Sequence, residues 1–94
     1  MNTIKDSGMV SLSMLLFRAR HYHKVFGDKM PVALRKQISN NAARQREISL
    51  YSSEFRKLAH ENFQLTNYAE ALDGIYAAGY TVHVCDQFGL KVNA

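Results

Sequence analysis

VSLSMLLFRARHYHKVF, residues 10–26, is the stretch that decides the fold of this 94-residue chain. Its apolar side chains recur every three or four residues, which is the spacing along one side of an α-helix. A helix that is apolar on two sides is either central to its domain or shared between subunits. This segment has two such sides: Leu12, Leu15, Leu16, Ala19, Tyr22 and Phe26 form the first, and Val10, Met14, Phe17, His21 and Val25 form the second.

The residues after this segment predict the end of one helix and the start of another. Gly27 tolerates the left-handed conformation in which many helices end. Asp28 is a favoured N-cap residue, and Pro31 suits a first helical turn, where a missing N–H costs little. We therefore expect the first helix to cover residues 10–26 and the second to begin near Pro31 with Asp28 as its cap.

The run Ser39-Asn40-Asn41 leaves the length of the second helix open. These side chains compete for backbone hydrogen bonds and favour caps and turns. Either one long helix runs from Pro31 to Asn62, or the chain breaks near Ser39. The helical period of apolar residues is present on both sides of the run, at Leu34, Ile38 and Ala42 and then at Ile48, Tyr51, Phe55, Leu58 and Ala59.

The C-terminal part predicts a short helix over residues 67–77 and then a β-hairpin over residues 80–93. Gly79 ends the helix, and Tyr80 to Cys85 alternates in side-chain type as a strand does. Residues 86–89 have turn character, and residues 90–92 can return as a second strand. Tyr80, Val82 and Val84 would share one face of the first strand, opposite Thr81, His83 and Cys85.

The predicted fold class is α+β, mainly α, with three or four helices followed by a C-terminal β-hairpin. We expect a flexible N-terminal tail over residues 1–8 and one small domain over residues 9–94, helical over residues 10–77. A lone hairpin is marginal in water, so it must pack on the helices or extend a sheet across a dimer. Together with the second apolar side of the first helix, this predicts a homodimer.

Composition and targeting patterns limit the class of protein. The chain is 47% hydrophobic and 21% charged, which argues against global disorder. Cys85 cannot form an intrachain disulfide because it is the single cysteine, which favours a reducing compartment. The apolar run at residues 9–17 is too short to span a bilayer and lacks the pattern of a signal peptide. We therefore expect a cytoplasmic protein with no membrane partner.

Charge is unevenly distributed along the chain. Residues 18–46 hold eight basic residues and one acidic residue, a net charge of +7, whereas residues 47–94 carry a net charge of −3. A block this basic is typical of a surface that meets a polyanion or an acidic protein. The distribution therefore points to a macromolecular partner of negative charge.

The first functional prediction is a small, basic, non-catalytic nucleic-acid-binding accessory or regulatory protein. If the chain breaks near Ser39, residues 32–38 and 41–50 outline a helix-turn-helix. Arginine can bond guanine, and asparagine or glutamine can bond adenine, in the DNA major groove, so DNA is favoured over RNA. The predicted contact residues are Arg18, Arg20, Lys24, Arg35, Lys36, Asn41, Arg44, Gln45 and Arg46.

The alternative prediction is a protein-binding module, an inhibitor or adaptor of the kind that mobile elements encode. Its basic face would dock an acidic partner. Phe17 on the first helix and Phe88 at the tip of the hairpin would be the interface anchors, since exposed aromatic residues commonly anchor interfaces.

Other chemistry has less support in the sequence. The helix at residues 67–77 and the hairpin have the order of a winged helix-turn-helix, but Glu70 and Asp73 would repel phosphates. His83 and Cys85 share a strand face, yet a structural zinc needs four ligands. No glycine-rich phosphate loop, paired-carboxylate motif or serine elbow is present. We therefore expect no enzyme activity, no metal and no cofactor.

Overall fold

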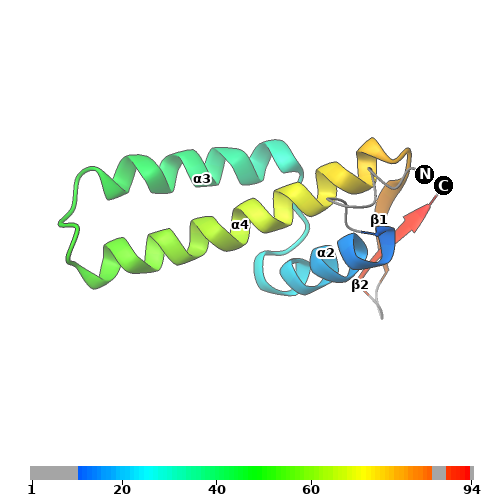
Figure 1. The fold of residues 1–94 in the computed structure, drawn as a ribbon, viewed down its shortest axis with the longest axis horizontal. Coiled ribbons are helices and arrows are strands. Elements are labelled where there is room, and N and C mark those ends of the chain that lie inside the picture. The colour runs from blue at the N-terminus through cyan, green and yellow to red at the C-terminus, as the bar shows by residue number, and fades with distance from the viewer. Residues whose placement is uncertain (1–10, 86–88, 94) are drawn as a thin grey trace.

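Two long helices, α3 (Pro31–Gln45) and α4 (Ser53–Ala77), lie antiparallel and form the longest part of the molecule (Figure 1). The computed structural model describes residues 11–85 and 89–93. Helix α2 (Leu12–Phe26) packs beside the C-terminal half of α4, and strands β1 (Thr81–Cys85) and β2 (Gly89–Asn93) pair as an antiparallel hairpin. The predicted fold class, mainly α with a C-terminal β-hairpin, is confirmed.

Three sequence predictions fall on residues outside the described part of the chain. They are the N-terminal tail at residues 1–8, the position of Val10 on the first helix, and the turn at the hairpin tip with Phe88.

The connection between α2 and α3 follows the predicted glycine and proline but not the predicted cap. Gly27 has φ +86°, and its N–H donates to the carbonyl of His23, which ends α2. Helix α3 begins at Pro31, but its N-cap is Met30 and not Asp28. The residue before a proline is driven toward extended backbone. Met30 is extended for that reason, and the helix therefore begins at the proline.

Both predictions for the length of the second helix are wrong. Helix α3 continues through Ser39 to Gln45, and the chain turns over residues 46–52 before α4. The break near Ser39, one of the two alternatives, is absent because the side chain of Asn41 is bonded to α4 and does not compete with its own backbone. The helix-turn-helix over residues 32–38 and 41–50 is therefore not formed, and residues 67–77 are the last part of α4, not a separate helix.

A polar cluster around the buried Asn41 joins α3 to α4. Asn41 is 6% exposed, and its Nδ2 donates to Glu61 Oε2 at 2.8 Å and to Asn62 Oδ1 at 2.9 Å. Its Oδ1 accepts from Gln37 Nε2, and Asn62 Nδ2 donates to the carbonyl of Ile38. A displacement of α3 along α4 would leave the buried amide of Asn41 without its partners on α4, so the cluster sets the register of the helix pair.

The hydrophobic core lies where α2 crosses the C-terminal half of α4. Tyr22, Phe26 and Tyr68 stack with ring centroids 6.1–6.3 Å apart, and Tyr68 Oη donates to the carbonyl of Gly27 at 2.8 Å. This bond ties the end of α2 to the middle of α4. The buried apolar residues are Ala19, Leu34, Leu65, Tyr68, Ala69, Ala71, Leu72, Ile75 and Leu90.

The β-hairpin is supported by the helices of its own chain. Leu90 is buried in the core, and Arg20 Nε on α2 donates to its carbonyl at 2.9 Å. Tyr80 and Val82 pack against the core, whereas Thr81 and His83 are exposed, as predicted for the two faces of β1. Packing on the helices, the first of the two supports expected for the hairpin, is therefore present within one chain.

Replacement of Asn41 tests the polar cluster between α3 and α4. We expect Asn41→Ala to lower the free energy of unfolding by about 1–3 kcal/mol, because Glu61 and Asn62 lose a buried donor. The matched control is Asn40→Ala, at the neighbouring exposed position of the same helix. Urea unfolding followed by circular dichroism measures both. Equal losses in the two variants would contradict a register role for Asn41.

Replacement of Tyr68 tests whether its hydroxyl is buried in the core, because burial changes the pH at which this hydroxyl loses its proton. Burial raises the pKa of the Tyr68 hydroxyl above its ordinary value of 10.0. The folded chain therefore holds this proton more tightly than the unfolded chain, and the resulting stabilisation is lost as pH rises from about 10 through the raised pKa. Tyr68→Phe should remove the step that lies above the ordinary tyrosine range in the absorbance titration of tyrosinate, and Tyr51→Phe, at an exposed position, should retain that step. The reverse assignment would refute the buried hydroxyl.

Candidate functional site

Five of the nine predicted nucleic-acid contacts bond to other parts of their own chain. Arg20 donates to β2, Arg35 pairs with Asp73, and Asn41 is buried between α3 and α4. Arg44 pairs with Glu54, and Gln45 Nε2 donates to the carbonyl of Phe55 at 3.2 Å. These side chains thus use their polar atoms to hold α2 to β2 and α3 to α4. The same atoms would be needed to contact a nucleic acid.

Arg44 makes the most extensive of these contacts. Its Nε and Nη2 donate to the two carboxylate oxygens of Glu54 at 3.0 and 3.3 Å, and Nη1 lies 3.6 Å from Glu47 Oε1. The hydrogen bond and charge of Glu54 raise the pKa of Arg44 above its ordinary value. Because the pair is exposed, its effect on stability is modest. Its geometric effect is to hold the end of α3 against the start of α4.

The basic block does not form one face of α3. Arg35 and Arg44 are nine residues apart, which is two and a half helical turns, so they lie on opposite flanks of the helix. Lys36 is exposed between them, and Arg46 lies in the turn after the helix. Arg18, Lys24, Lys36 and Arg46 are exposed and have no internal partner within the part of the chain that the structure describes.

The second apolar side predicted for the first helix is exposed in the structure. Phe17 is 70% exposed, Val25 53% and Met14 47%, and the exposed His21 lies between them on the helix. We call Met14, Phe17, His21 and Val25 the outer face of α2. The opposite side, with Leu15, Leu16, Ala19 and Tyr22, packs on the core. The fold leaves the outer face to solvent.

Positive charge borders the outer face of α2. Arg18 and Lys24 are exposed on its two flanks, and α2 contains no acidic residue. The third cation of the helix, Arg20, is turned to the carbonyl of Leu90. The outer face is thus a row of three apolar side chains and His21 between two cations.

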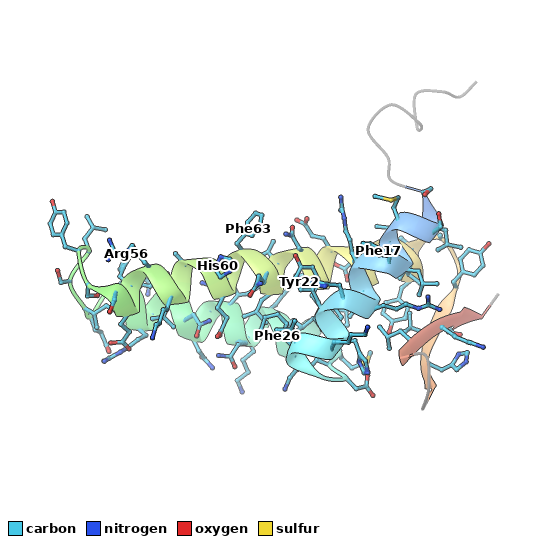
Figure 2. All side chains as sticks on the ribbon, turned by 90° about the horizontal axis from the view of Figure 1, so that it is seen from below. Phe17, Tyr22, Phe26, Arg56, His60 and Phe63 are labelled. Carbon is cyan, nitrogen blue, oxygen red and sulfur yellow. The ribbon has the colours of Figure 1, made fainter. Side chains whose placement is uncertain are left out.

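Other exposed apolar residues lie along the helix pair. Phe63 projects from α4 on the side away from α3 (Figure 2) and is 64% exposed. Leu50 and Tyr51 lie in the turn between α3 and α4, although the helical period had placed Tyr51 on an apolar helix face. Ser49 and Ser52 bond the backbone of this turn, and Ser52 caps α4. The three serines at positions 49, 52 and 53 were the sequence signal for the turn.

The remaining predicted site residues give no further cluster. Phe88, the second predicted interface anchor, lies outside the described residues, as does the side chain of Cys85. Nδ1 of His23 is buried without a hydrogen-bond partner among the described residues. No group of three or more His, Cys, Asp or Glu that could hold a metal ion occurs within residues 11–85 and 89–93.

Comparisons with known proteins find no family model, curated protein or solved structure that matches this chain. Within the described residues, none of the helices combines the length and apolar character needed to cross a lipid bilayer.

Substitutions on the two sides of α2 separate the outer face from the core. We expect Phe17→Ser to change the free energy of unfolding by less than about 0.5 kcal/mol, because Phe17 is exposed and the two residues have similar helix propensity. Leu16→Ser, one position earlier and packed on the core, should cost at least about 2 kcal/mol. Chemical denaturation measures both. A loss for Phe17→Ser as large as that for Leu16→Ser would place Phe17 in the core.

Proposed function

We propose that this protein is a non-catalytic protein-binding module that docks an acidic partner through the outer face of α2. The observation that carries the proposal is the exposure of Met14, Phe17 and Val25 along one side of a helix whose other side completes the core. Contiguous exposed apolar residues bordered by polar ones are typical of interaction sites.

The energetics of these side chains support a partner. Full burial of a Phe, Val or Met side chain contributes about 1.5–3 kcal/mol. Phe17 and Val25 are more than half exposed, so most of this free energy is not used by the fold and is open to a partner. Aromatic residues and Met are also enriched in the buried cores of protein interfaces.

The charge of the flanks supports an acidic partner. Arg18 and Lys24 have no internal partner within the described residues, and no acidic residue of α2 neutralises them. Complementary charge around an apolar contact speeds association and selects the partner. A partner surface with apolar side chains at its centre and acidic residues around them fits the apolar side chains of the outer face and the two cations that flank it.

Nucleic-acid binding, the function predicted first from the charge block, has less support from the placement of its residues. Among the predicted contact residues, the four cations without internal partners in the described part of the chain lie on α2, α3 and the turn after α3, and Arg35 and Arg44 are directed to acidic residues of α4. A phosphate-binding surface needs several cations along one track. The outer face of α2 instead places apolar side chains between its cations.

Site-specific photo-cross-linking tests the proposal. A photoreactive phenylalanine analogue at position 17 should give protein adducts in extract of the native cells, and Val25→Ser should reduce their yield by removing a neighbouring apolar contact. The same analogue at Ser39, on the exposed side of α3, is the matched control. Equal adduct yields at positions 17 and 39, or no effect of Val25→Ser, would refute docking through this face.

A further inference from the structure

We infer that the occupant of the outer face of α2 is an acidic amphipathic helix of a different protein, not a second copy of this chain. The inference rests on the proposed function. It adds that the partner segment is helical and that the partner is a different protein. Three observations carry it. They are the spacing of the side chains on the outer face, the like charges that self-pairing would bring together, and the bonds that most described acidic residues make within their own chain.

The spacing of the outer face fits a helix. Met14, Phe17, His21 and Val25 follow each other at intervals of three, four and four residues, which is close to the repeat that packs one helix along another. From Met14 to Val25 the row is about 16 Å long at the α-helical rise of 1.5 Å per residue. An amphipathic helix of about three turns covers such a row with its own apolar side chains.

Self-pairing of α2 would bring like charges together. In an antiparallel pair centred on His21, Phe17 lies opposite Val25 of the second copy, but the flank with Arg18 runs along the Arg18 flank of that copy, and the flank with Lys24 runs along its Lys24 flank. A parallel pair in register places the Arg18 flank of each copy along the Lys24 flank of the other. Like charges across an interface disfavour the pairing, and α2 has no acidic residue that could relieve them.

The rest of a second copy has few free acidic groups to offer. Among the described residues, Asp73 pairs with Arg35, Glu54 and Glu47 contact Arg44, and Glu61 accepts from Asn41. Asp28 and Glu70 are exposed without such contacts, but they lie on different elements, one before α3 and one on α4. A second copy therefore presents no acidic helix face that matches Arg18 and Lys24.

Peptide binding to the full chain tests this inference. The probe is a labelled helical peptide of three heptads with Leu at the a and d positions and Glu at the e and g positions, whose charges oppose self-pairing. A basic peptide has Lys at e and g, and a permuted acidic peptide has the same composition without the helical pattern. Fluorescence anisotropy measures binding to the wild-type chain, to Phe17→Ser and to the double variant Arg18→Glu with Lys24→Glu.

We expect the acidic helical peptide to bind the wild-type chain and to bind at least about tenfold more weakly to the double variant and to Phe17→Ser. The double variant should instead bind the basic peptide, which shows that charge selects the partner and that the variant is folded. Equal binding of the permuted peptide, or no loss in the double variant, would overturn the inference. The peptide result could overturn the inference while the photo-cross-linking at position 17 still depends on Val25. The proposed function would then stand, and the claim that the partner is an acidic helix would be wrong.

Two further measurements complete the test. Sedimentation equilibrium should show a monomer, and a dimer that dissociates in Phe17→Ser would overturn the inference in favour of a second copy. Labelled duplex DNA and single-stranded RNA should not compete with the acidic peptide. Competition by either one, with a steep dependence on salt and loss in the double variant, would identify a nucleic acid as the occupant.

Discussion

The hydrogen bonds from Asn41 to Glu61 and Asn62 are the interaction on which the rest of the structure depends. They fix α3 on α4 at one register, because a shift of one turn would leave a buried amide and a carboxylate without partners. With that register set, Arg35 reaches Asp73 near one end of the pair and Gln45 reaches Phe55 near the other. The pair is then a fixed support on which α2 packs with one of its two apolar sides.

Features that depend on neighbouring residues were predictable from the sequence. The apolar period of α2, the left-handed glycine at its end, the proline that opens α3 and the alternating faces of β1 all occur as predicted. The continuity of α3 was not predictable in this way. The local residue preferences of Ser39-Asn40-Asn41 predict a helix end. The partner of Asn41, Glu61, which keeps Asn41 inside the helix, lies 20 residues further along the chain.

The same distinction separates the two candidate sites. The outer face of α2 is visible in the sequence, because its apolar side chains lie within one helix and their period reports the face directly. The basic block was a weaker guide, since the acidic residues that engage Arg35 and Arg44 are 38 and 10 residues away and fall in the half of the chain with the opposite net charge. A regional charge count cannot show which cations are already neutralised.

The bond between Arg20 and Leu90 has a consequence for synthesis of the protein. It joins residues 70 positions apart, and Leu90 is a core residue that follows all three described helices in the chain. During translation the described core therefore lacks Leu90, and is incomplete, until residue 90 has emerged from the ribosome. Until then α2 exposes part of its inner side as well as its outer face, so the nascent chain presents more apolar surface to chaperones than the folded protein does.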